Sequence, residues 1–306
     1  MSKQTCHMIR TDAKRCFLSW RFLAIIFAIA MICIMGMSEN WGLIFSGNVR
    51  DIMSSADQLN KMMTFDRFKP LMIVALAAVY SNSFAEDWNH RYFRFIFSRS
   101  GLASYVISKV IVTIIAVIIA ATCGFLLFGI VMYPWMRIGG IEGVFETEGC
   151  FSEYSEILVG SAPVVYFLIQ GWNFGLSASC IALIGLWLTV KKPNSFVGIG
   201  GTFFVFYFIY AISVWISPEG FNFLSVSSMI GVGLYVQSLE TKLLYHTLYL
   251  FVCNLIPAVG FYLSLRKRWK CGNLQERMYD CKGTIGTMER QCSDSNGIWY
   301  GSDHAY

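Results

Sequence analysis

Apolar residues occur in blocks of about twenty, separated by short polar segments. A block of that length crosses the roughly 30 Å hydrocarbon layer of a bilayer as a single helix. The pattern therefore predicts an all-α polytopic membrane protein with six transmembrane helices. The predicted spans are residues 22–37, 68–84, 105–133, 162–190, 196–216 and 243–265.

The segment before the first span has its own pattern. Between residues 5 and 21, apolar and basic residues recur at helical spacing on opposite sides. This predicts an amphipathic helix lying in the inner membrane interface, which we name the elbow helix. The alternative is a simple basic flank that orients the first span.

The longer connections between spans also carry patterns. The polar stretch 38–69 predicts a short helix near 52–63, and the loop 134–160 is acidic. The stretch 217–242 is broken by glycines and serines, which favours a re-entrant segment before the last helix. An outer-surface loop with a short amphipathic helix is the alternative for 217–242.

Composition and charge support this assignment and give it an orientation. Only 14% of the residues are charged, against about 25% in soluble domains. An N-terminus inside the cell places 18 of the 24 Lys and Arg residues in inner segments, so both termini are expected in the cytoplasm and the protein in the cell (inner) membrane. The sequence contains no basic stripe with interleaved aromatic residues, so a nucleic-acid partner is not expected.

Catalytic motifs are absent from the sequence. It contains neither a Gly-x4-Gly-Lys phosphate loop nor His-Glu-x-x-His, and its four histidines are far apart. We therefore expect no enzyme activity, no metal site and no cofactor on this chain. The predicted spans also show no buried charge of the kind that ion-coupled transporters need, which indicates an external source of energy.

Neutral polar and small residues stand out within the spans. Three neutral polar residues are candidates for a substrate path: Gln170, Asn173 and Asn254. Contacts between helices are an equally good explanation for them. A second set forms a small-residue stripe that predicts a helix contact, within the subunit or across a dimer: Gly171, Gly175 and Ser179.

The segment between the second and third spans, 85–109, is the most informative. An acidic pair is followed by alternating aromatic and basic residues, and Ser100-Gly101 ends the pattern before the next helix. This predicts a short cytoplasmic helix, 87–100, suited to docking a soluble partner. The residues expected to carry that coupling are Glu86, Asp87, Arg91, Arg94, Ser98 and Arg99.

This segment, together with the six-span layout, resembles the permease subunits of ABC-2 type ABC transporters. The matching residues are Glu86, Ser98-Arg99, Tyr105 and Lys109. Two departures concern the docking details: Asn89-His90 stands where the family often has Gly-Thr, and Ser100-Gly101 where a Pro often follows Ser-Arg.

The resemblance implies a transmembrane domain over 1–268. The polarity and Gly/Ser content of residues 269–306 predict a loosely ordered cytoplasmic tail. The resemblance also implies a second permease subunit, expected to be a copy of the chain, and separate ABC ATPase subunits that carry ATP and Mg. Segment 217–242 would form the outer gate. The expected function is export of an amphipathic, peptide or lipid-like compound, and the alternative is a non-transporting scaffold or sensor partner of a soluble ATPase.

Overall fold

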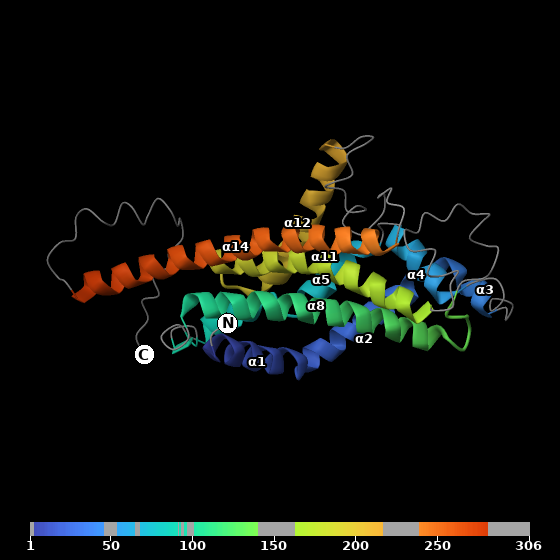
Figure 1. Cartoon of the computed structure of the whole chain (residues 1–306), viewed down its shortest axis with the longest axis horizontal. Helices are drawn as coiled ribbons and strands as arrows, with labels where there is room; N and C mark the ends of the chain where they lie inside the picture. The colour runs from blue at the N-terminus through green and yellow to red at the C-terminus, as the bar shows by residue number, and fades with distance from the viewer. Residues whose placement is uncertain are drawn as a thin grey trace. The chain divides into compact units, whose positions relative to one another are not determined.

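The protein is described here from a computed structural model that is helical throughout its described residues. These are residues 3–45, 54–64, 68–90, 92, 95–96, 101–139, 163–216 and 239–280. Its elements are α1 (Lys3–Phe17), α2 (Trp20–Gly36), η1 (Ser38–Asn40), α3 (Trp41–Phe45), α4 (Ser55–Thr64), α5 (Lys69–Ala77), α6 (Ser83–Asn89), α8 (Leu102–Met132), α11 (Pro163–Lys191), α12 (Ser195–Ile216) and α14 (Leu239–Asp280). Figure 1 shows these helices along the chain.

Within the described residues, three helices are long and apolar enough to cross a membrane: Leu102–Met132, Pro163–Lys191 and Leu243–Lys270. A fourth candidate is the pair α1 and α2, which meet at a bend of 57°. This supports a membrane protein with three or four candidate spans, and six spans remain a prediction. The inferred re-entrant segment 217–242 and loop 134–160 lie largely outside the described residues.

The predicted second span, 68–84, is not one helix. Helix α5 ends at Ala77, a run of turns follows, and α6 starts at Ser83. Ser81, Asn82 and Ser83 fall at this break, and a side-chain oxygen of each is buried without a hydrogen-bond partner within the described residues. The apolar composition of 68–84 did not reveal the break.

The two longest predicted spans within the chain are confirmed, with ends set by glycine and proline. Helix α8 begins after Gly101, whose φ of 73° lies in the left-handed region that glycine tolerates without strain. Helix α11 starts on Pro163, a favoured first residue, and ends just before Pro193. The side chain of Asn194 then accepts a 3.0 Å hydrogen bond from the Phe196 N–H and starts α12.

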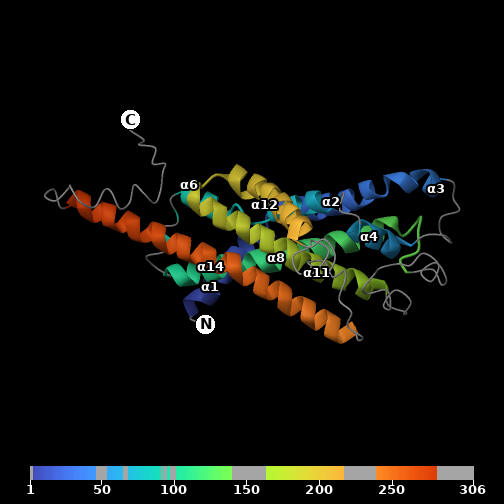
Figure 2. The same ribbon diagram turned by 90° about the horizontal axis from the view of Figure 1, so that it is seen from above.

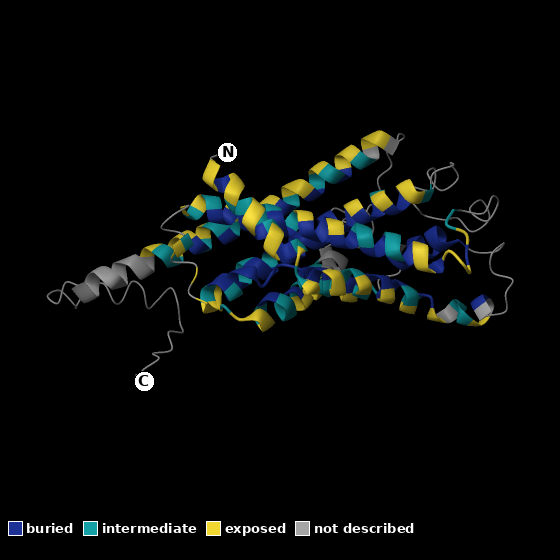
Figure 3. Cartoon of the chain, turned by 90° about the horizontal axis from the view of Figure 1, so that it is seen from below, coloured by how far each residue is buried: buried dark blue, intermediate teal, exposed yellow. Residues whose placement is uncertain are grey.

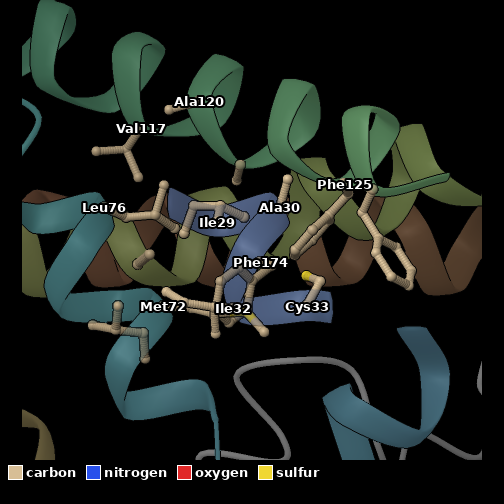
Figure 4. Packing of buried hydrophobic residues seen from close by; sticks show 14 of the residues in the cluster. Ile29, Ala30, Ile32, Cys33, Met72, Leu76, Val117, Ala120, Phe125 and Phe174 are labelled. Atoms are coloured by element: carbon tan, nitrogen blue, oxygen red, sulfur yellow. The ribbon is translucent and has the colours of Figure 1, made fainter. Parts of the chain in front are cut away.

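The apolar core lies among α2, α5, α8 and α11. Figure 4 shows side chains of α2 gathered against the other three helices, with Ile29 and Cys33 fully buried. Phe125 of α8 and Phe174 of α11 stack nearby with ring centroids 5.7 Å apart. Close packing here places α8 at the centre of the described fold.

Glycine lets α8 and α11 approach closely, and both views show them side by side (Figures 1 and 2). A Cβ atom on Gly175 would lie 2.6 Å from the Cα of Ile118, and one on Gly171 equally close to the Cα of Thr122. Both distances are far below contact, so only glycine fits. The two glycines of the small-residue stripe predicted from the sequence thus face α8 within one chain, whereas its third member, Ser179, hydrogen-bonds to α14.

Helix α14 is joined to α11 by polar groups. Asn254 donates to the Leu176 carbonyl at 3.0 Å and accepts from the Ser179 hydroxyl at 2.8 Å. Pro257 cannot donate to the carbonyl of Cys253 one turn earlier, and the Cys180 thiol donates to that carbonyl instead, at 3.5 Å. Each of these groups makes a hydrogen bond that lipid could not provide.

The polar stretch 38–69 also contains its predicted short helix, α4. Most of its described side chains are buried although several are polar, among them Asp57 and Gln58. Gln58 accepts a 3.2 Å hydrogen bond from Asn40, and the Ser55 N–H donates to the Arg137 carbonyl at 2.9 Å. Helix α4 is therefore an integral part of the packed fold.

The chain divides into two units, Met1–Phe261 and Tyr262–Tyr306. Helix α14 continues through 269–280, where the sequence predicted the start of a loosely ordered tail. Residues 281–306 lie outside the described part of the chain. The functional features below belong to the first unit.

We predict that Gly175→Ala lowers stability by about 1–3 kcal/mol, because the added methyl group forces α11 away from α8. The matched control is Gly200→Ala in α12, where the nearest atoms are 3.5 Å or more away. There alanine should be neutral or stabilising by about 0.5–1 kcal/mol. Thermal unfolding in detergent, followed by tryptophan fluorescence, measures both, and equal effects would contradict the close approach.

Candidate functional site

The most unusual feature of the fold is a buried lysine in the first third of α8. Lys109 is 0% exposed. Its Nζ lies 3.1 Å from Asp12 Oδ1, 2.8 Å from Asp87 Oδ2 and 3.2 Å from the Tyr80 hydroxyl. A buried ammonium is tolerated only when paired and hydrogen-bonded in this way.

Asp12, on α1, contacts this lysine although it lies 97 residues earlier in the sequence. It is the only carboxylate of α1 and points into the protein. Its oxygens also accept hydrogen bonds from the Ser108 hydroxyl at 2.6 Å and the Tyr80 hydroxyl at 3.0 Å. Helix α1 is thereby joined to α8 through buried polar contacts.

Asp87 extends the network through α6. It accepts from the Tyr105 hydroxyl at 2.9 Å and is paired with Arg15 of α1 at 2.5 Å. Arg15 also lies 3.3 Å from Glu86, which pairs in turn with Arg21 at the start of α2. We name the six alternating charges the charge cluster: Arg21, Glu86, Arg15, Asp87, Lys109 and Asp12.

The electrostatics of Asp87 follow from these neighbours. Burial by itself raises the pKa of this carboxyl group, but Lys109 and Arg15 together outweigh burial and hold the pKa below its usual value. Asp87 is therefore ionised, and the three cations of the cluster balance its three anions. The cluster connects α1, the start of α2, α6 and α8 as one electrostatic unit.

The predicted coupling residues differ in their surroundings. Asp87 is fully buried and held by Lys109, Arg15 and Tyr105, so its carboxylate stabilises the protein internally. Glu86 is partly exposed and paired with Arg15 and Arg21. The other four lie outside the described residues: Arg91, Arg94, Ser98 and Arg99. Docking of a partner on this segment remains a prediction.

The helix carrying the acidic pair differs in its limits from the expected 87–100. Helix α6 begins at Ser83 and ends at Asn89, so Glu86 and Asp87 lie inside it. Beyond it, Tyr92 and Phe95 are described and are 57% and 72% exposed. Two exposed aromatic side chains therefore lie just after α6 in the sequence.

The expectation that the spans hold no buried charge is wrong for α8. Lys109 lies about two turns inside this candidate span and is completely enclosed. Composition could not reveal this, because the carboxylates that neutralise it come from α1 and α6, 97 and 22 residues away along the sequence. The sequence reasoning also missed Asp12, Tyr80 and Ser108. The usable signal was a single acidic residue in an otherwise basic helix.

The three substrate-path candidates have different surroundings. Asn254 is fully engaged, since its amide also donates to the Leu250 carbonyl at 2.8 Å. Asn173 is completely buried. Gln170 donates to the Tyr166 hydroxyl at 3.2 Å, while its Oε1 is buried with no hydrogen-bond partner within the described part of the chain. Of the three, Gln170 and Asn173 each carry a buried side-chain oxygen that accepts no hydrogen bond within these residues.

No group of three or more His, Cys, Asp or Glu side chains within the described ranges could hold a metal ion. No family model, curated protein or solved structure matches the chain. The charge cluster is therefore interpreted from its own geometry.

We predict that Lys109→Met destabilises the protein by about 3–5 kcal/mol, because it leaves Asp12 and Asp87 buried without their shared cation. Adding Asp12→Asn should recover part of that loss, since it removes one of the uncompensated charges. Lys191→Met removes an exposed lysine that forms no ion pair within the described residues and should cost only about 0–0.5 kcal/mol. Unfolding midpoints in detergent measure all three, and a Lys109→Met variant as stable as Lys191→Met would contradict the assigned pairing.

We also predict a pH dependence that belongs to Asp87. Because its folded pKa lies below the ordinary value of about 3.9, the group contributes stability above about pH 5 and loses that contribution as the pH falls through 4. The Asp87→Asn variant should be less stable than the wild type near pH 6 and less sensitive to acid. Unfolding midpoints between about pH 6 and pH 3 test this, with parallel curves as the contrary result.

Proposed function

We propose that the chain is the membrane-spanning permease subunit of an ATP-driven ABC exporter, working with separate ATPase subunits. The observation that carries the proposal is the charge cluster, which joins α6 to α1 on one side and to α8 on the other. Helix α6 belongs to the segment that resembles the ATPase-docking region of ABC-2 permeases.

The ion pair between Asp87 of α6 and Lys109 of α8 allows force to pass from one helix to the other. A docking segment connected only by loops would move without moving the spans. Breaking a buried ion pair by removing one partner costs about 3–5 kcal/mol, so Asp87 and Lys109 remain together when α6 is displaced. A push on α6 therefore becomes a movement of α8, and through Arg15 and Asp12 a movement of α1.

The docking surface itself is proposed from exposure. Tyr92 and Phe95 present large aromatic side chains just beyond α6. Aromatic residues that fill pockets of a partner supply much of the binding energy at protein interfaces. We assign them to contact with the ATPase, while Glu86 and Asp87 hold the segment on the permease.

The site of ATP binding, the second permease copy and the cargo path are proposed from the sequence. The chain has no phosphate-binding loop, so ATP and Mg would be held by the partner. A second copy of the chain would complete the pathway, with both termini in the cytoplasm. Gln170, whose buried Oε1 accepts no hydrogen bond within the described residues, and Asn173, which is completely buried, are the stronger substrate-path candidates for an amphipathic, peptide or lipid-like cargo.

We predict that Tyr92→Ser with Phe95→Ser abolishes association with the proposed ATPase partner, identified as the soluble ATPase that co-purifies with the wild type, and leaves the unfolding midpoint unchanged. The matched control is Tyr133→Ser with Trp135→Ser, which removes two exposed aromatics at the other end of α8. Co-purification and ATPase stimulation in nanodiscs are the measurements. Equal association of both double variants would remove the docking assignment.

The same preparation separates docking from transmission. Asp87→Asn should still bind the ATPase but lose most of the stimulation, because α6 is no longer joined to Lys109 by an ion pair. Stimulation of the wild type without movement of any cargo would identify the chain as a scaffold or sensor. Transport by the purified chain alone would refute the proposed function.

A further inference from the structure

Helix α1 exposes charges of one sign only. Lys3, His7, Arg10 and Lys14 are exposed and recur at intervals of four, three and four residues, so they share one face. Figure 3 shows exposed residues along this N-terminal helix. The only carboxylate of α1, Asp12, is turned inward to Lys109. The outward face therefore carries no negative charge of its own.

This positive charge is also uncompensated by neighbouring elements. Arg15 and Arg21 are neutralised by Glu86 and Asp87. No ion pair joins Lys3, Arg10 or Lys14 to another residue of the described ranges. We call Lys3, Arg10 and Lys14 the cationic face.

The cationic face ends at two strongly exposed apolar side chains. At the bend between α1 and α2, Leu18 is 84% and Trp20 80% exposed. Tryptophan is enriched at the level of lipid headgroups, where its ring is apolar and its N–H remains hydrated. The bend thus has the composition of a membrane–water boundary.

Helix α2 continues this boundary into an apolar face. Its exposed large side chains recur along one side of the helix: Leu23, Phe27, Met31 and Met35. Because this stripe begins where the cationic face ends, one continuous surface passes from basic to apolar. Such a transition matches the headgroups and the hydrocarbon of one bilayer leaflet, and an acidic soluble protein would not match its apolar part.

We propose that the cationic face of α1 binds the headgroups of anionic phospholipids. The inward side of the same helix holds Asp12 and Arg15 against α8 and α6. Lipid binding therefore stabilises the position of α1 in the charge cluster, and the protein becomes sensitive to the anionic content of its membrane. This inference requires only that the chain lies in a membrane and is independent of the transport proposal.

The test uses the full-length chain, delipidated in detergent and titrated with phosphatidylglycerol or phosphatidylcholine. Native mass spectrometry counts the lipids retained. The wild type should retain phosphatidylglycerol in preference to phosphatidylcholine. Since each Lys or Arg near an anionic surface strengthens binding about fivefold, Arg10→Gln with Lys14→Gln should weaken phosphatidylglycerol retention by about 5- to 30-fold.

The matched control is Arg10→Lys with Lys14→Arg, which keeps both positive charges on the cationic face. It should change phosphatidylglycerol retention by less than about twofold. A second measurement needs no variant: raising the salt from about 0.05 M to about 0.5 M should release phosphatidylglycerol from the wild type and leave phosphatidylcholine unaffected.

Three results would overturn the proposal. The first is equal retention of the two lipids by the wild type, and the second is an equal loss in both double variants. The third is an Arg10→Gln, Lys14→Gln variant that keeps its lipid preference but no longer binds the purified ATPase, which would make the cationic face a protein-binding surface.

Discussion

The buried ammonium group of Lys109 is the constraint on which the described fold depends. Without water around it, this charge requires carboxylates within ion-pair distance, and Asp12 and Asp87 supply them from α1 and α6. Two elements that are separate in sequence are thereby fixed against α8. The hydroxyl groups of Tyr80, Tyr105 and Ser108 complete the hydrogen bonds of the two carboxylates.

Around this polar centre, the helices are held together by different means. Glycine allows the backbones of α8 and α11 to approach, and apolar side chains of α2 and α5 fill the remaining space. Helix α14 relies instead on Asn254 and on the carbonyl that Pro257 leaves without a backbone donor. The polar ties of α14 and the charge cluster lie on different helices, so rearranging one does not require breaking the other.

Within the coupling segment, the internal and external functions fall on different residues. Glu86 and Asp87 face the charge cluster, whereas Tyr92 and Phe95 are exposed beyond it. Helix α1 has the same division, with Asp12 and its neighbours inward and the cationic face outward. A partner protein at one surface and lipid headgroups at the other would thus act on a single buried network.

By itself, the sequence determined the helical class, the ends of α8 and α11 and the stripe containing Gly171 and Gly175, because these depend on local apolar runs, Pro, Gly and spacing. Tertiary structure alone decided that 68–84 is broken and that Lys109 is paired with Asp12, 97 residues away. Pairing across such a separation depends on how α1 packs against α8. Hydropathy scores each segment in isolation and so records a lysine in an apolar helix without its counter-charge.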